Sequence, residues 1–145
     1  MNEIIVPLKL INLGDDGFHL LVEIVVFGEK HLMVVDTGAS RTVFDNALLN
    51  LHAAEISIEA GEHHEEHQAT TLFSTSNTVL ATLPRLKIGK LKLKNYKAVG
   101  LDLQSVNDTY AQLGHPLIAG ILGGDILLEY HAKINYKKHR LKLYK

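Results

Sequence analysis

The chain has 145 residues, the length of one average domain, and its composition of 46% hydrophobic and 21% charged residues excludes intrinsic disorder. Fifteen basic and sixteen acidic residues nearly cancel, so no overall field draws in nucleic acid or an anionic membrane. The absence of cysteine excludes disulfides and thiolate zinc sites. We therefore expect a single domain over residues 1–145 that recognises its partners locally.

The first forty residues predict strands. Residues 4–10 and 20–26 carry an apolar residue at every second position, on either side of a turn cluster at 13–17. A second turn at 27–30 leads into the apolar run 32–35, which predicts a strand buried on both faces. Asp45 then predicts the N-cap of a short helix at 46–51.

The remainder of the chain predicts mostly strands. Residues 57–78 are polar and give no clear element, whereas alternation returns at 86–88 and 90–94. The lysines of 90–94 all point to one side, which we interpret as a solvated strand face, with a functional basic patch as the alternative. Further strands are predicted at 99–103, at 118–122 and in a C-terminal hairpin with a basic turn, and Asp125 predicts a helix cap. We expect about nine short strands and two short helices.

Asp36 is unusual because it directly follows four apolar residues. A buried carboxylate is costly unless it is hydrogen-bonded or holds its proton. Gly38 lets the backbone approach closely, and the hydroxyl of Thr37 offers a donor and an acceptor beside the acid. Together these residues predict a carboxylate presented at a tight turn at the end of a core strand.

The segment from Val34 to Ser40 resembles the active-site motif of retropepsin-like aspartic proteases, the retroviral-type, single-domain family. About 85 residues later, residues 121–123 resemble the apolar-apolar-glycine element that follows in this family. The resemblance implies a mostly β acid protease fold, a closed barrel-like domain with one or two short helices and one lobe per chain. Because the chain has one Asp-Thr-Gly, it also implies a homodimer that brings two acids together.

The resemblance also implies a role for each site residue. Asp36 of each copy would flank one water, one carboxyl group as general base and the other as general acid, and the pair would share one proton, as is known for aspartic proteases. Thr37 would brace the two catalytic loops across the dimer. Substrate would be contacted by Gly38, Ala39 and Ser40. The catalytic loop would be supported by Ile121, Leu122 and Gly123.

Two alternatives remain open in this interpretation. The family closes over substrate with a glycine-tipped flap, and residues 57–78, where the flap would lie, lack such a tip. A protease-like module that binds peptides or assembles with partners, with little turnover, is therefore the alternative function. Asp125 as a second catalytic acid of the same chain is a weaker rival, because no Thr-Gly follows it.

The histidines raise a different chemistry. Residues 63–67 match the H-x-x-E-H pattern of inverted zinc proteases, but they lie in a polar stretch of a mostly β chain. We interpret them as a solvated charged loop, with incidental or catalytic zinc binding as alternatives. His19, His31 and His115 have no partner spacing and are interpreted as surface or turn residues. We expect no metal and no cofactor.

The expected partners are a peptide or protein substrate and a second copy of the chain, without nucleic acid or membrane. No stretch approaches the roughly 20 apolar residues that span a bilayer, and residues 1–10 lack the pattern of a secretory signal. We expect a soluble protein and favour the cytoplasm, while a leader removed before this sequence begins would leave export open.

Overall fold

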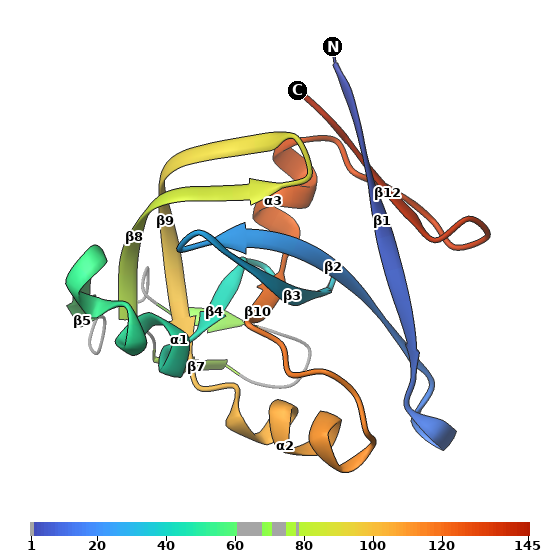
Figure 1. Cartoon of the computed structure of the whole chain (residues 1–145), viewed down its shortest axis with the longest axis horizontal. Coiled ribbons are helices and arrows are strands. Elements are labelled where there is room, and N and C mark those ends of the chain that lie inside the picture. The colour runs from blue at the N-terminus through green and yellow to red at the C-terminus, as the bar shows by residue number, and fades with distance from the viewer. Residues whose placement is uncertain (1, 61–67, 71–74, 78) are drawn as a thin grey trace.

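A computed structural model describes residues 2–60, 68–70, 75–77 and 79–145 of the chain (Figure 1). The strands are β1 (Glu3–Asn12), β2 (Phe18–Val26), β3 (Glu29–Val35), β4 (Val43–Asp45), β5 (Ser57–Ala60), β6 (Gln68–Thr70), β7 (Thr75–Asn77), β8 (Val79–Ile88), β9 (Leu91–Leu101), β10 (Gly120–Leu122), β11 (Lys133–Asn135) and β12 (Arg140–Tyr144). The helices are α1 (Asn46–Leu51), α2 (Gln104–Gln112) and α3 (Gly124–Glu129), with 3-10 turns at Gly14–Asp16 and Ala53–Glu55.

The centre of the fold is a closed barrel of six strands. Its hydrogen-bonded order is β2-β3-β10-β4-β9-β8, and the barrel closes because Val25 and Val26 of β2 pair with Lys87 and Leu86 of β8. The short strand β10 runs parallel to β3 and antiparallel to β4, so it lies between two strands that are close in sequence. The mostly β, closed barrel-like fold expected from the sequence is confirmed.

Both ends of the chain lie on the outside of this barrel. The second half of β1 pairs with β2, while its first half, Glu3 to Pro7, pairs with β12. Asn2 N–H donates to the Lys145 carbonyl at 2.8 Å, and Lys145 N–H donates back to the Asn2 carbonyl at 3.0 Å. The two termini therefore lie side by side, as Figure 1 shows, and the predicted C-terminal hairpin is present as β11 and β12.

Strand β3 separates two hydrophobic clusters. Met33 is fully buried in the larger cluster inside the barrel, and Val34 is buried in a second cluster with residues of β10 and α2. The apolar run 32–35 is thus a strand with side chains buried on both faces, as predicted. The same two-sided packing fixes where β3 ends, which is directly before Asp36.

The helix content differs from the sequence expectation. The described residues form three α-helices and twelve strands, where about nine strands and two helices were expected. The helix that was missed is α2, whose segment has only two large apolar residues, Val106 and Tyr110. It is held by the burial of Tyr110 in the second cluster rather than by a broad apolar stripe.

Two sequence interpretations fall largely outside the described residues. The H-x-x-E-H pattern at 63–67 lies entirely outside the described residues. Of the segment 57–78, which was expected to form the flap, the described residues are those of the short strands β5, β6 and β7. No helix among the described residues has the length and apolar character needed to cross a bilayer.

Candidate active site

Asp36 lies in a tight turn fixed by backbone hydrogen bonds. Its N–H donates to the Leu122 carbonyl at 3.0 Å, and its own carbonyl accepts from Ala39 N–H at 3.2 Å. Its carboxylate Oδ1 accepts from Gly38 N–H at 2.9 Å. The carboxylate therefore has a defined orientation at the end of β3, and the predicted turn is present.

Strand β10 and the start of α3 hold the other side of this turn. Gly123 N–H donates to Oγ1 of the buried Thr42 at 3.0 Å, and Gly124 N–H donates to the Ala39 carbonyl at 2.7 Å. A Cβ at Gly123 would lie 2.5 Å from the carbonyl oxygen of Arg41, so only glycine fits there without movement of the backbone. Residues 121–123 thus lie against the turn that contains Asp36.

Asp125 is not at the N-cap position of α3, which corrects the sequence expectation, but its Oδ1 does accept from the Ile126 N–H in the first turn of that helix at 2.9 Å. The cap position is taken by Gly123, and Asp125 is the second residue of the helix. Its Oδ1 accepts from the N–H and Oγ1 of Thr42 at 2.8 and 2.7 Å, and its Oδ2 accepts from the Tyr96 hydroxyl at 2.8 Å. Burial, and next the negative charge of Asp125, raise the pKa of Tyr96, which keeps this hydroxyl a donor.

The two carboxylate oxygens of Asp125 link three parts of the chain by hydrogen bonds. They connect α3 to the segment after Asp36 and to β9. Asp125 is absent from the walls of the pocket that contains Asp36. Its contacts support a structural role. They give no support to the rival idea that Asp125 is a second catalytic acid.

A pocket of about 280 Å³ opens beside Asp36. Its walls come from β2, β3, α2, β10 and the C-terminal hairpin, and they are formed by Phe18, His19, Leu20, Val34, Val35, Asp36, Thr37, Val106, Tyr110, Ile118, Ile121, Ile134 and Tyr136. Most of these side chains are apolar, with the carboxylate at one side. Such a pocket suits an apolar side chain of a peptide whose backbone passes Asp36.

His19 and Tyr110 form a polar pair in the wall of this pocket. The His19 Nδ1 and the Tyr110 hydroxyl share a hydrogen bond, and the two ring centroids are 5.8 Å apart. Burial lowers the pKa of His19, opposed by the carboxylate of Asp36, and burial raises the pKa of Tyr110 to about 12. His19 was interpreted as a surface residue from the sequence, and the structure corrects this.

The remaining predicted site residues differ in exposure. Thr37, Gly38 and Ser40 are exposed, so they are accessible to a substrate or to a second copy of the chain. Ala39 is only 1% exposed and packs in the second cluster. The methyl group of Ala39 is therefore packed among neighbouring side chains, while its backbone N–H and carbonyl are hydrogen-bonded to Asp36 and Gly124.

The two other histidines singled out from the sequence, His115 and His31, lie outside the walls of the Asp36 pocket. His115 Nε2 is hydrogen-bonded to the Asn12 carbonyl at 2.6 Å, and its ring meets the edge of Tyr110, so it joins the loop after α2 to the end of β1. His31 is half-buried in β3. Among the described residues no three His, Asp or Glu side chains are grouped in a way that would hold a metal ion.

Comparison with known families agrees with this geometry. The family model for aspartyl proteases matches residues 22–126, which include Asp36, its turn and the supporting strand β10. The chain belongs to the aspartyl protease family. Its aspartyl protease fold is similar to the crystal structure of a retropepsin-like aspartic protease from Rickettsia conorii, with a TM-score of 0.56 and 22% identity over 99% of this chain and 91% of that one. No curated protein matches the chain.

Proposed function

We propose that this chain is an aspartic endopeptidase that works as a homodimer, with residues 1–145 as one lobe and Asp36 of each copy in a shared catalytic dyad. The observation that carries the proposal is the position of Asp36. Its carboxylate is oriented by Gly38 N–H at the end of a core strand and lines a largely apolar pocket. The single Asp-Thr-Gly of the chain supports the second copy as the source of the second acid.

In this mechanism the two carboxyl groups hold one water between them. Because two adjacent like charges cannot both ionise cheaply, one group keeps a proton and acts as general acid while the other activates the water as general base. The water adds to the peptide carbonyl, and the amide nitrogen leaves after it receives a proton. The exposed Thr37 would bind the partner's turn, and the backbone of Gly38 would bind the substrate.

The dimer would form without exchange of terminal strands. The backbone groups of β1 and β12 are already paired within one chain, so a second copy is expected on another surface. Phe18 and Tyr136, which are 61% and 68% exposed, both line the pocket that contains Asp36. We expect this apolar surface to face the second copy or the substrate.

The test of function is cleavage of a mixed peptide library between about pH 4 and 7, a range chosen for a dyad that shares a proton. Wild type is compared with Asp36→Asn, with and without a transition-state-mimicking aspartic protease inhibitor. Cleavage that is lost with both the variant and the inhibitor is the expected result. A wild-type protein that is folded and dimeric but cleaves no peptide would contradict the proposed endopeptidase activity and favour a peptide-binding module.

The dimer is tested separately by sedimentation at micromolar concentration. Wild type should sediment at about twice the 16.1 kDa chain mass. The variant Phe18→Ser/Tyr136→Ser should shift toward the monomer if these side chains face the second copy, whereas Leu51→Ser, which changes an exposed residue of α1 outside the pocket, should not. A wild type that is monomeric at all concentrations would exclude the shared dyad.

A further inference from the structure

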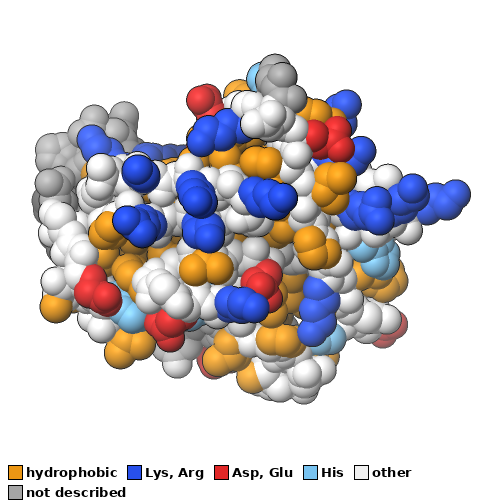
Figure 2. Space-filling model, turned by 45° about the horizontal axis from the view of Figure 1, so that its top comes forward, with side chains coloured by type: hydrophobic (Ala, Val, Ile, Leu, Met, Phe, Trp, Pro, Cys, Tyr) orange, Lys and Arg blue, Asp and Glu red, His pale blue; other side chains and the backbone are white. Residues whose placement is uncertain are grey.

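The hairpin of β8 and β9 carries a concentration of positive charge. Residues 79–101 contain six basic residues and no Asp or Glu, in a chain whose net charge is only −1. Figure 2 shows Lys and Arg side chains gathered on the side of the molecule that comes forward in that view. The near-neutral total therefore hides a strongly uneven distribution of charge.

Four of these residues face one another across the hairpin. Arg85 lies directly opposite Lys94, and Lys87 lies directly opposite Lys92, all on the exposed face. Like charges at directly opposite positions of an antiparallel pair are destabilising. Within the part of the chain that the structure describes, no carboxylate forms an ion pair with any of the four.

The same four side chains surround a hollow, which we call the basic hairpin groove. Its volume is about 310 Å³, and it is lined by Arg85, Leu86, Lys87, Lys92, Leu93 and Lys94. Along each strand the two cations are two positions apart, which corresponds to roughly 6.7 Å in a β-strand. An extended peptide presents alternate side chains at the same spacing, so Asp or Glu at every second position would match both pairs.

This geometry points to one class of partner. Proteins that bind single-stranded nucleic acid stack bases on aromatic side chains, and none of the residues that line the groove is aromatic. An anionic bilayer attracts any cluster of cations and makes no use of a hollow between them. We propose that the basic hairpin groove binds an extended acidic segment of a partner protein, with Asp or Glu at alternating positions.

The proposal does not depend on proteolysis, because none of the residues that line the groove lines the pocket of Asp36. Binding is therefore measured with the Asp36→Asn chain, which leaves the peptide intact if the wild type is a protease. The test uses three fluorescent peptides of about ten residues, which in extended form match the length of β8. One alternates Glu and Ser, one has the same composition with all Glu in a block, and one alternates Gln and Ser.

Fluorescence anisotropy should show saturable binding of the alternating acidic peptide at about 50 mM salt and weaker binding at about 300 mM, because salt screens charge pairs at a surface. The block peptide should bind several-fold more weakly, and the Gln peptide should not bind. Lys87→Glu/Lys92→Glu should lower the affinity at least tenfold.

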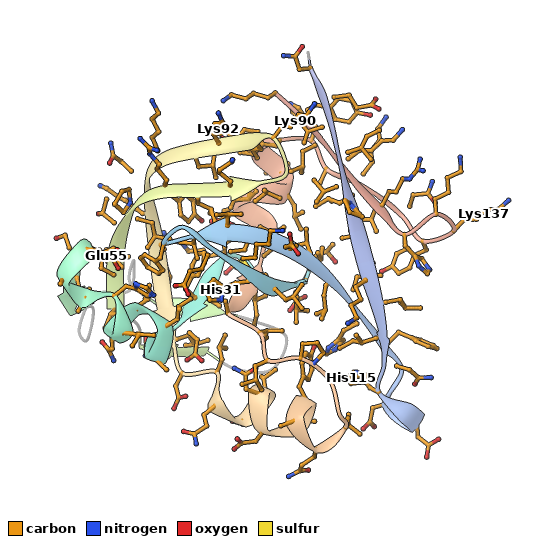
Figure 3. The ribbon with its side chains drawn as sticks, in the orientation of Figure 1. His31, Glu55, Lys90, Lys92, His115 and Lys137 are labelled. Carbon is orange, nitrogen blue, oxygen red and sulfur yellow. The ribbon has the colours of Figure 1, made fainter. Side chains whose placement is uncertain are left out.

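The matched control is Lys137→Glu/Lys138→Glu, which changes the net charge equally at the turn of the C-terminal hairpin. Figure 3 shows Lys137 at that turn, far from Lys90 and Lys92 on the β8–β9 hairpin. The control should keep its affinity within about twofold, and circular dichroism should show that both variants fold. Equal losses in the two variants, equal binding of block and alternating peptides, or tighter binding to phosphatidylserine vesicles or to oligo-dT would overturn the proposal.

Discussion

The hydroxyl of Tyr110 in α2 shares a hydrogen bond with Nδ1 of His19 in β2, although the two residues are 91 positions apart in the chain. The bond holds α2 against the pocket that contains Asp36. It also places an imidazole in the electrostatic field of that carboxylate. Stability and the chemistry of the site are therefore linked through His19.

His19 should make stability depend on pH. Burial lowers its pKa in the folded chain below the usual value of 6.5, so between these two pKa values the unfolded chain binds a proton that the folded chain does not. The free energy of unfolding should therefore fall as the pH decreases from above 6.5 through the lowered pKa. His19→Gln should remove this contribution.

The measurement is urea unfolding of the wild type and of His19→Gln at several pH values, both above 6.5 and below the lowered pKa of His19. The wild type should lose more stability toward acid than His19→Gln, and His139→Gln, which changes an exposed imidazole, should follow the wild type. Parallel curves for wild type and His19→Gln would contradict the prediction.

Asp125→Ala should be strongly destabilising. The change removes the acceptor for the Thr42 backbone N–H, the Thr42 hydroxyl and the Tyr96 hydroxyl. Each buried donor left without a partner costs about 1–3 kcal/mol, so the two donors of the buried Thr42 alone should lower the free energy of unfolding by at least about 2 kcal/mol. Glu129→Ala, an exposed acid of the same helix, should stay within about 0.5 kcal/mol in the same denaturation experiment. Similar losses for the two variants would indicate that the described bonds contribute little.

The two adjacent glycines after β10 should differ in their tolerance of a methyl group. A Cβ at Gly123 would lie 2.5 Å from the Arg41 carbonyl oxygen, whereas one at Gly124 would come no closer than 3.2 Å, to the Ala39 carbonyl oxygen. Gly123→Ala should therefore cost about 1–3 kcal/mol, as overpacking does, and should lower cleavage by displacing the turn of Asp36. Gly124→Ala should cost clearly less, because alanine also favours the helix. The order of the two melting temperatures decides the prediction.

Removing charge from the basic hairpin groove should stabilise the fold. Lys87→Gln/Lys92→Gln relieves a directly opposed pair of like charges, which should raise the free energy of unfolding by about 0.2–1 kcal/mol at low salt. The gain should shrink at about 1 M salt, where the Debye length is only about 3 Å. Lys137→Gln/Lys138→Gln is the control for net charge. A destabilised double variant would mean that the lysines make favourable contacts in the folded chain.

The turn of Asp36 could be predicted because its signals are local. An apolar run, an acid, a hydroxyl and a glycine are consecutive in the chain, and β3 ends where that run ends. The closed β fold could be predicted from the resemblance of residues 34–40 and 121–123 to the aspartic protease motifs, and from the alternating apolar residues of β1 and β2.

Features set by distant residues could not be predicted in this way. Asp125 follows two glycines and has the local pattern of a helix cap, but its position is decided by Thr42, 83 residues earlier. The pairing of His19 with Tyr110 leaves no spacing signal at all, and α2 depends on the burial of Tyr110. In each case the decisive partner is distant in the sequence.

The insertion of β10 between β3 and β4 also has a consequence for how the protein folds. The turn of Asp36 is held by Leu122 and by the contact of Gly123 with Thr42, which joins residues 81 positions apart. Contacts of such separation form late and slow the folding of β domains. On the ribosome, Asp36 is made before β10 and α3, so it lacks their support until these elements have emerged. The nascent chain should therefore order the turn of Asp36 only after residues 120–129 have left the ribosome.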